Sequence, residues 1–559
     1  MRETRLFNDN WKFIKIEPGT TGYENSDSWV NVDIPHDWLI YDTNNLYEDS
    51  EGWYRKTFDL KIQTGVKYAL RFDGVYMEPA VYVNGQKAGE WKYGYNTFEI
   101  DITDYLVNGT NEIRVQVLHR FPNSRWYSGA GIFRNIWFKT MPDTHFVSDG
   151  IYIRTERKDG GYILKASSEI SGSGFDAVAY TVFDMEGTAI VSKTTDAAAD
   201  TVEIEVESPK EWDIDNPVCY VLRTELLYNG QAVDCVDTRF GFRTIEFNSE
   251  SGFYLNGRHV KLNGVCMHHD LGALGAAVNK TALYRQLKMM KDMGVNAIRT
   301  SHNMPAVELL DIADEIGLLV DNEAFDMWKM PKNRYDFARF FEEWAAKDMR
   351  NFVRRDRNHP CVIMWSIGNE IFDTHADEES GMKSTKLLYE AVIENDPDRN
   401  AYATFGSNFL EGEPTQRCAD VLKLVGYNYS ERLYDAHHKA HPDWCIYGSE
   451  TGSTLQSRGV YHFPYSEPIL TDVDEQCSSL GNSTCSWGAP NSEFCITTER
   501  DNKYSAGQFL WTGFDYIGEP TPYQTKNSYF GQVDTAGFPK DTYYIYRAEW
   551  TDYKTDPMV

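Results

Sequence analysis

Two apolar runs in this chain each end at a glutamate that could do chemistry. The first, IMWSIGNEIF (363–372), places Glu370 directly after Gly368 and an asparagine, and the second, CIYGSETGS (445–453), places Glu450 after a glycine and a serine. A single acid at the end of a strand is usually solvated or caps a helix. Two facing acids, one protonated and one ionised, can instead cleave a glycosidic bond.

The C-terminal half has the strand and helix pattern that could bring these acids together. From residue 246 to residue 559, apolar strand-like runs alternate with helical segments, which predicts a TIM (β/α)8 barrel. A doubly wound open sheet is the alternative, and it is weakened because no glycine-rich phosphate motif follows the first strand. The eight expected strands are 259–268, 295–302, 318–323, 361–370, 400–406, 422–429, 445–450 and 507–516.

Glu370 ends the fourth of these strands and Glu450 ends the seventh. In a closed barrel the carboxyl ends of the strands meet at one mouth, so the two acids are expected to face each other there. A separation of about 5–5.5 Å would suit a retaining glycosidase, and about 6.5–9.5 Å an inverting one.

Three helices of the barrel can be placed from apolar spacing and from stop signals. The segment 279–294 has apolar residues on one helical face, which is expected to pack against the barrel. The segment 305–317 is expected to begin with Pro305 in its first turn and to end before Gly317. The last segment, 540–553, should close the barrel. The expected inward residues are Leu283, Leu287 and Met290 in the first helix, and Tyr544, Ala548 and Tyr553 or Trp550 in the last.

The first 245 residues are expected to be entirely β. Residues 1–143 contain short alternating runs and turn signals such as Asn84-Gly85, which predict a jelly-roll β-sandwich. Residues 144–245 continue in the same way for about a hundred residues, the length of one immunoglobulin-like β-sandwich. The segment FGFRTIEF (240–247) marks the join to the barrel.

Composition excludes several kinds of partner. The 559 residues carry a formal net charge of −29, which disfavours binding to nucleic acid or to anionic lipid. No apolar run reaches transmembrane length and no secretory h-region opens the chain, so we expect a cytoplasmic protein. The nine cysteines fit no common zinc spacing and are expected to be free thiols.

Several motifs together resemble glycoside hydrolase family 2, the family of β-galactosidases, β-glucuronidases and β-mannosidases. The segments WSIGNE and YGSE resemble its acid/base and nucleophile segments, and IPHDW (34–38), GWYRK (52–56) and NSRWYSGAGIFRNIW (123–137) resemble its jelly roll. The resemblance covers nearly the whole chain. It implies a retaining mechanism in which Glu370 is the general acid/base and Glu450 is the nucleophile.

The resemblance also implies a set of substrate-binding residues. Asn369 would bind the sugar 2-hydroxyl, and Arg299 would bind Glu450 and keep it ionised. Tyr429 would donate its hydroxyl to the nucleophile. The remaining members are His268 and His302, which could instead be hydrogen-bonded strand-end histidines, and Trp511, which offers a platform for a sugar or simply closes the core.

The sugar is expected to be a β-D-galactoside. β-Glucuronidases of this family carry an Asn-x-Lys pair after the eighth strand, whereas this chain has Lys526 followed by Asn527. The segments 509–523 and 537–550 resemble the β-galactosidase branch. A β-glucuronidase or β-galacturonidase remains the alternative, as does a non-catalytic carbohydrate-binding protein, although such a protein would be expected to lack one carboxylate.

No metal and no other cofactor is expected. Some large β-galactosidases of the family bind Mg²⁺ through a Glu and a His just after the third strand, together with the acid/base. This chain has Asp326 and Trp328 there, and an indole cannot ligate a hard cation. The insertion 451–490 has no periodicity and is expected to wall the leaving-group subsite or to be only partly ordered. The chain is either a short member of the family or a truncated one, and it should expose apolar patches near its C-terminus or form a homo-oligomer.

Overall fold

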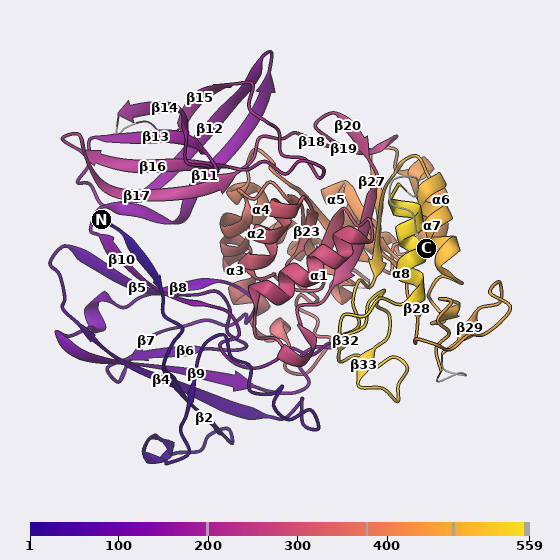
Figure 1. The fold of residues 1–559 in the computed structure, drawn as a ribbon, viewed down its shortest axis with the longest axis horizontal. Coiled ribbons are helices and arrows are strands. Elements are labelled where there is room, and N and C mark those ends of the chain that lie inside the picture. Colours follow the sequence, from indigo (N-terminus) through magenta and orange to yellow (C-terminus); the bar gives the residue numbers. More distant parts are fainter. Residues whose placement is uncertain (197–198, 200, 376–377, 472–475, 553–559) are drawn as a thin grey trace.

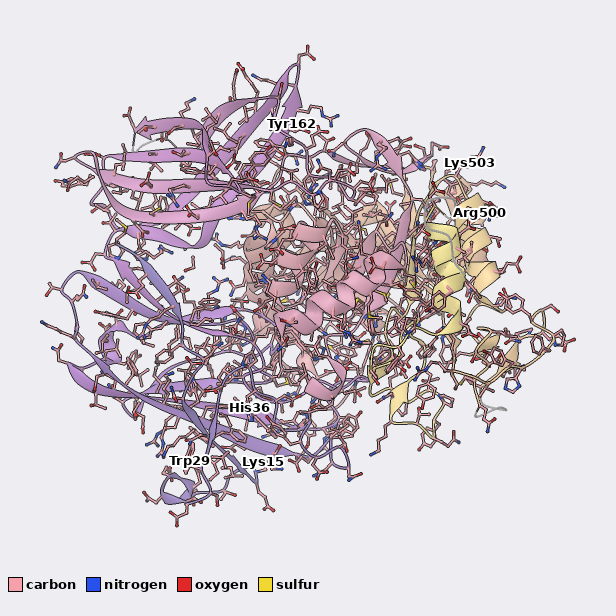
Figure 2. All side chains as sticks on the ribbon, in the orientation of Figure 1. Lys15, Trp29, His36, Tyr162, Arg500 and Lys503 are labelled. Atoms are coloured by element: carbon pink, nitrogen blue, oxygen red, sulfur yellow. The ribbon has the colours of Figure 1, made fainter. Side chains whose placement is uncertain are left out.

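The computed structural model describes residues 1–552 apart from 197–198, 200, 376–377 and 472–475. Two β-sandwiches and a closed barrel follow one another along the chain, as the sequence predicts. Figure 1 shows both sandwiches on one side of the barrel helices, with the C-terminal segments on the other side. In Figure 2, Lys15, Trp29 and His36 belong to the first sandwich and Tyr162 to the second, while Arg500 and Lys503 lie in the C-terminal part of the barrel.

The first sandwich consists of a four-stranded and a six-stranded antiparallel sheet. Its strands alternate inward and outward, so that Ile113, Val115 and Val117 of one strand are fully buried. The expected turn at Asn84-Gly85 joins two of its strands. In spatial order the sheets are β1 (Glu3–Leu6), β10 (Ile136–Pro142), β5 (Val66–Phe72) and β8 (Phe98–Asp101), and β3 (Val30–Val32), β2 (Trp11–Ile16), β4 (Ser50–Leu60), β9 (Gly109–His119), β6 (Ala80–Val83) and β7 (Gln86–Glu90).

The second sandwich has seven strands in sheets of three and four. It has a hydrophobic core of its own, to which Val202, Ile204 and Val206 contribute from one alternating strand. The sheets are β11 (His145–Lys158), β12 (Gly161–Ser171) and β15 (Thr201–Glu207), and β14 (Ala189–Asp196), β13 (Ala177–Asp184), β16 (Tyr220–Tyr228) and β17 (Gln231–Phe240). A small sheet of β18 (Ile245–Asn248), β19 (Gly252–Leu255) and β20 (Arg258–Val260) leads into the barrel.

The predicted TIM barrel is confirmed. Eight parallel strands close on themselves in sequence order, and each corresponds to one of the eight predicted runs. All eight are buried along nearly their whole length, which is why they appear in the sequence as continuous apolar runs. The strands are β21 (Leu262–Met267), β22 (Ala297–Thr300), β23 (Leu319–Glu323), β24 (Val362–Asn369), β25 (Tyr402–Ser407), β26 (Leu424–Asn428), β27 (Cys445–Gly452) and β31 (Ser505–Trp511).

One α-helix follows each barrel strand. The first buries Leu283, Leu287 and Met290 as predicted. The second ends at Gly317, whose φ of 75° gives the left-handed cap. The helices are α1 (Lys280–Asp292), α2 (Val307–Ile316), α3 (Phe341–Asp356), α4 (Glu378–Asn395), α5 (Glu413–Leu422), α6 (Tyr434–Ala440), α7 (Ser492–Asp501) and α8 (Asp541–Trp550).

Two details of the helix predictions are wrong. Pro305 precedes the N-cap residue Ala306 and therefore lies outside the first turn of α2. The last helix α8 buries Thr542, Tyr543 and Tyr546, while Tyr544 and Ala548 face solvent. Tyr543 and Tyr544 are adjacent at the start of α8, and the prediction from apolar spacing named Tyr544 as the inward residue instead of Tyr543. Trp550 is half-buried, and Tyr553 lies outside the described residues.

The first sandwich docks on the barrel through buried polar contacts. The Tyr93 hydroxyl donates to the carbonyl of Ala324 (2.7 Å), just after the third barrel strand. The Arg134 guanidinium donates to the carbonyls of Met304 (2.7 Å) and Pro305 (3.0 Å). These contacts hold the loops of the sandwich against the carboxyl ends of the barrel strands.

Three further predictions concern the cysteines, membrane-spanning helices and exposed apolar residues near the C-terminus. The cysteines at positions 219, 235, 266, 361, 418, 445 and 495 are free thiols, as expected. Over the described part of the chain, no helix combines the length and apolar character needed to cross a membrane. Phe494 and Tyr544 in the C-terminal region are exposed, at 43% and 45%. Whether a further domain or a second copy covers them stays a prediction.

Candidate active site

A cavity of about 720 Å³ opens at the carboxyl ends of the barrel strands. This is well above the lower limit of about 300 Å³ for ligand sites and offers space beyond one sugar ring. Residues from both the barrel and the first sandwich line it. They are Arg125, His302, Glu370, Asn408, Asn428, Tyr429, Ser430, Arg432, Glu450, Ser453, Ser486, Trp487, Trp511, Glu519, Thr521 and Phe530.

Glu450 lies on the floor of this cavity, in β27, with 3% of its surface exposed. Its Oε1 accepts a hydrogen bond from Nη1 of Arg299 (2.8 Å), and its Oε2 accepts one from the hydroxyl of Tyr429 (2.8 Å). Nε2 of His302 lies 3.7 Å from the same Oε1. Each carboxylate oxygen therefore has a fixed donor, and the position of the group is fixed.

Glu370 follows the end of β24 and lines the same cavity. Its Oε1 accepts from Nδ2 of Asn428 (3.0 Å). Its Oε2 faces Nη1 of Arg125 at 3.8 Å, too far for a hydrogen bond. One oxygen of Glu370 thus remains available to a substrate. The structure places both predicted carboxylates in one cavity.

The backbone around the cavity is strained in a way typical of functional sites. Glu370, Tyr429, Ser453 and Glu519 have φ values of 46°, 52°, 58° and 44°. Residues other than Gly and Asn rarely adopt this left-handed backbone region, yet all four of these residues do so and line the cavity. Backbone hydrogen bonds hold three of them in place, for example from the Glu370 N–H to the carbonyl of Gly406 (2.8 Å). Such strain persists where the surrounding structure over-determines the conformation.

A fully buried cation organises the acids beneath the cavity. Arg299 donates to Glu450, to Oε2 of Glu323 (2.6 Å from Nη2) and to Oδ1 of Asn369 (2.9 Å). Its Nε lies 3.8 Å from Oδ2 of Asp321. One guanidinium therefore lies against three carboxyl groups, and the sequence predicted only its contact with Glu450.

Replacing Arg299 by Met should destabilise the fold as well as the site. The substitution leaves Glu450, Glu323 and Asp321 buried without their shared cation, which should cost about 3–5 kcal/mol of unfolding free energy. The midpoint of chemical denaturation measures the loss. The exposed pair of Arg223 and Asp237 provides the control. Arg223→Met should cost about 1 kcal/mol or less. Equal losses in the two variants would contradict this role of Arg299.

Burial dominates the electrostatics of Glu450. Desolvation raises its pKa to about 8, Arg299 and the Tyr429 hydroxyl oppose the rise, and the nearby charge of Glu370 adds to it. The sequence predicted that Arg299 keeps Glu450 ionised. Arg299 does lower the Glu450 pKa, but burial raises it by more. The Glu450 carboxyl therefore keeps its proton to a higher pH than a solvated glutamate does.

The other predicted residues fall into two groups. Tyr429, His302 and Trp511 line the cavity, and the His302 ring stacks on the Trp511 indole with centroids 5.0 Å apart. Burial keeps the His302 pKa well below its usual value, so the ring is neutral. It donates from Nδ1 to Oε1 of Glu323 (2.7 Å) and leaves Nε2 as an acceptor.

Asn369 and His268 lie behind the cavity wall. Asn369 is fully buried, and its amide donates to Oδ1 of Asp326 (2.9 Å). His268 packs against the rings of Trp126, Trp511 and Tyr516, and neither of its ring nitrogens has a hydrogen-bond partner within the described chain. Contact of these two residues with a sugar stays a prediction.

Arg125 and Glu519 are among the cavity residues that were not predicted from the sequence. Arg125 comes from the first sandwich, inside the segment NSRWYSGAGIFRNIW, and Glu519 comes from the loop after the eighth strand. Backbone hydrogen bonds join them: the Glu519 N–H donates to the carbonyl of Arg125 (2.9 Å), and the Tyr127 N–H donates to that of Ile517 (2.9 Å). Arg125 is one of two charged residues, with Arg134, in a motif otherwise made mostly of aromatic and small residues, and this was the signal that could have found it.

The segment after the third strand does not fit a divalent cation. The Asp326 carboxylate is paired with Arg125 (2.9 Å) and Lys332 (2.8 Å). Burial opposes the charged form of this carboxylate, but the two cations outweigh burial and lower its pKa to about 2. The Trp328 indole N–H donates to the carbonyl of Ile367 (3.0 Å). Two cations already occupy the position where Mg²⁺ would need several oxygens, so we derive no step through a metal.

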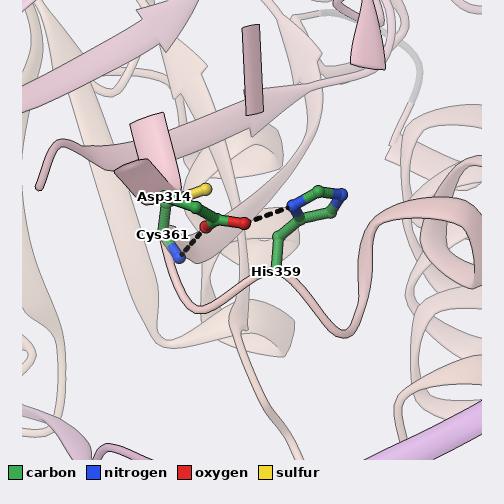
Figure 3. A group of neighbouring side chains, drawn as sticks. All are labelled: Asp314, His359 and Cys361. Carbon is green, nitrogen blue, oxygen red and sulfur yellow. Dashed lines mark hydrogen bonds and ion pairs between the residues drawn. The ribbon is translucent and has the colours of Figure 1, made fainter. Parts of the chain in front are cut away.

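A second cluster of potential ligands, shown in Figure 3, is a structural ion pair. His359 lies 2.6 Å from Oδ2 of Asp314, whose Oδ1 accepts from the N–H of Cys361 (3.0 Å). Burial opposes the charge of His359, but Asp314 raises its pKa to about 9, so the ring is protonated. Burial keeps the pKa of the Cys361 thiol well above its usual value, which makes it a poor metal ligand. These residues precede β24 and end α2, at the opposite end of the barrel from the cavity.

Comparison with known proteins gives one consistent family. Residues 17–142 match the "sugar binding domain" of the glycosyl hydrolases family 2, residues 145–243 match its middle domain, and residues 246–447 match its "TIM barrel domain". These three ranges follow the two sandwiches and the barrel.

Two curated relatives cover nearly the whole chain. Beta-galactosidase BoGH2A of Bacteroides ovatus is 38% identical over 99% of this chain and 72% of its own length. A putative beta-glucuronidase of Formosa agariphila is 33% identical over 99% of this chain, which spans 56% of that protein.

Solved structures agree on the architecture. A beta-glycosidase from Bacteroides vulgatus superposes with a TM-score of 0.87 at 30% identity, over 98% of this chain and 75% of that one. A family 2 member from Bacteroides cellulosilyticus gives 0.82 at 30% identity, over 98% and 71%. Sequence, fold and the domain matches together place this chain in glycoside hydrolase family 2, and it is a glycoside hydrolase.

Proposed function

We propose that this enzyme is a retaining exo-β-glycosidase that hydrolyses terminal β-D-galactosides. The observation that carries the proposal is the pair of carboxylates, Glu370 and Glu450, in one cavity with different partners. Arg299 and Tyr429 each donate to Glu450, which suits a nucleophile that must be held still as an anion. Within the described residues, Glu370 accepts from Asn428 alone and has no hydrogen bond to its other oxygen, which suits a group that both gives and takes a proton.

The first step transfers the sugar to the enzyme. An oxygen of Glu450 attacks the anomeric carbon, the bond from that carbon to the leaving oxygen breaks, and Glu370 gives its proton to the leaving oxygen. The product is an ester between Glu450 and the sugar. The Tyr429 hydroxyl, whose pKa burial raises well above its usual value, remains a proton donor to Glu450 throughout.

The second step returns the enzyme to its starting state. Glu450 is now uncharged as an ester, and Glu370 as an anion takes a proton from a water molecule. The hydroxide oxygen attacks the anomeric carbon from the side that the leaving group vacated, and the ester bond to Glu450 breaks. Two inversions give a product with the original anomeric configuration, and the proton is again on Glu370.

The charges of the cavity favour a neutral sugar over a uronate. Arg125 is balanced by Asp326 and by Glu519, whose Oε1 lies 3.5 Å from it. The ammonium of Lys526, which follows the eighth strand, donates instead to the carbonyl of Thr43 (2.9 Å), and Lys526 does not line the cavity. A uronate would need a cation without such a counter-charge.

Relatives labelled β-glucuronidase keep the uronide alternative open, and the non-catalytic alternative would need a missing carboxylate. A panel of nitrophenyl β-glycosides separates the three possibilities. The galactoside should have the highest kcat/KM, with the glucuronide and galacturonide lower by at least about 100-fold, the ratio that about 2.7 kcal/mol of lost charge pairing gives. A higher activity on a uronide would contradict the proposed specificity for galactosides. A complete lack of hydrolysis would contradict the proposal that the protein is an active β-glycosidase.

The pH dependence should reflect the raised pKa of the nucleophile Glu450. Below about pH 8 a growing share of Glu450 is protonated and cannot attack, so kcat/KM should fall as the pH is lowered. In Glu370→Gln, assayed with a leaving group that needs no proton, this acidic decline should move to lower pH, because the charge of Glu370 no longer raises the Glu450 pKa. An acidic decline at the same pH in that variant would contradict the interaction between the two carboxyls.

A further inference from the structure

The insertion between β27 and α7 places one large aromatic residue at the rim of the cavity. Trp487 lines the cavity and is 56% exposed, an unusual exposure for an indole. The floor residues behave differently, since Glu450, His302 and Trp511 are 3%, 2% and 5% exposed. Exposure therefore increases from the floor of the cavity toward Trp487.

The backbone fixes Trp487 in this position. The Gly488 N–H donates to the carbonyl of Cys485 (3.0 Å), which closes a turn with Trp487 in its centre. The Ala489 N–H donates to the carbonyl of Gly452 (2.7 Å). A Cβ on Gly488 would lie 2.8 Å from the carbonyl oxygen of Ser453, so only glycine allows this approach.

A small sheet braces the same segment against the barrel. Strand β30 (Ser483–Thr484) pairs with β28 (Thr454–Leu455) and with β29 (Ile469–Leu470). The turn that carries Trp487 is thereby anchored to the end of the strand that carries Glu450, and its indole has a defined place relative to the nucleophile.

The rest of the rim is polar. Ser486 adjoins Trp487, Thr521 follows the eighth strand, and Asn408 and Arg432 follow the fifth and sixth strands. Glu411 neutralises Arg432, with Oε1 2.6 Å from Nη2. The rim thus offers one aromatic face, several hydroxyl and amide groups, and little net charge.

From this arrangement we propose that Trp487 is the platform of a leaving-group subsite that takes a neutral sugar ring. In an exo-acting site the terminal sugar occupies the floor beside the acids, so the leaving group must point outward to the rim. A sugar ring can lay its apolar face on an indole while its hydroxyls bond to the polar rim. An alkyl or aryl leaving group would leave most of those polar groups without partners. The inference rests on the proposed function and narrows its substrates to galactosyl-sugars.

Three substrates with the same terminal sugar test the proposal: a galactosyl disaccharide, nitrophenyl β-galactoside and β-galactosyl fluoride, which has no leaving-group ring. In Trp487→Ala, kcat/KM for the disaccharide should fall about tenfold, equivalent to about 1.4 kcal/mol. The value for the fluoride should stay within about twofold of the wild type. Trp487→Tyr should restore most of the disaccharide activity, because an aromatic face returns.

Phe463→Ala is the matched control, since Phe463 is on the same insertion, is 77% exposed and does not line the cavity. It should change none of the three activities. Equal losses on disaccharide and fluoride in Trp487→Ala, or no loss on either, would overturn the proposal. If Trp487→Ala lowered kcat/KM for the nitrophenyl substrate but not for the disaccharide, the proposal that a sugar occupies the leaving-group subsite would be wrong. Failure of the wild type to hydrolyse any of the three would instead refute the proposed galactosidase function.

Discussion

Glu450→Gln should abolish turnover of every glycoside, whatever its leaving group. The amide cannot attack the anomeric carbon, so no covalent intermediate forms, and kcat should fall by about 10⁴-fold or more. Substrates with good leaving groups should lose as much as poor ones, because the missing step precedes any help from an acid. Initial rates with nitrophenyl galactosides of different leaving-group acidity measure this.

Glutamine has nearly the shape of glutamate, so the fold should persist, and an unchanged thermal midpoint would confirm it. Glu499→Gln is the matched control. Glu499 is also a buried barrel acid, 2% exposed, but it bonds to Tyr434 and Ser505 and does not line the cavity. This variant should keep its rate within a few-fold. Residual activity above about 1% in Glu450→Gln would refute its role as nucleophile.

Glu370→Ala should have an effect that depends on the substrate. The first step still proceeds when the leaving group needs no proton, while substrates with poor leaving groups should lose about 10²–10⁴-fold. The second step slows for all substrates, because no base activates water. The glycosyl-enzyme should then accumulate, which a burst of nitrophenolate followed by slow turnover would reveal.

Azide separates the roles of the two acids. It is a strong nucleophile that needs no base, so it should accelerate the slow second step of Glu370→Ala and yield the β-glycosyl azide. In Glu450→Ala azide can only replace the missing nucleophile and would give the α-azide. A β-azide from Glu450→Ala, with none from Glu370→Ala, would mean that the assignment of the two roles is reversed.

The sequence predicted the architecture because its signals are local. The eight barrel strands are buried on both faces and therefore appear as continuous apolar runs, and Gly317 ends its helix where the left-handed conformation is needed. The resemblance located Glu370 and Glu450 at strand ends, and a closed barrel brings all strand ends to one mouth. The inward face of α8 was predicted wrongly because Tyr543 and Tyr544 are neighbours, and either satisfies the same spacing.

What the sequence did not predict depends on contacts between distant segments. Arg125 reaches the cavity because residues 125–127 of the first sandwich bond to residues 517–519 of the barrel. Neither segment alone indicates the other. The contact of Arg299 with Glu323 was not predicted either, because the two residues lie on different strands. In the sequence, Glu323 is only the last residue of an apolar run. Trp487 sits in an insertion without periodicity, and only the turn at Gly488 reveals its place.

Trapping the covalent intermediate tests the central claim most directly. A 2-deoxy-2-fluoro-β-galactoside with a good leaving group should inactivate the enzyme, since the fluorine slows both steps and the good leaving group speeds only the formation of the ester. Peptide mass spectrometry after proteolysis should then find one added fluorosugar on the peptide that contains CIYGSETGS, at Glu450. A sugar attached to Glu370, or inactivation without any covalent label, would contradict the account.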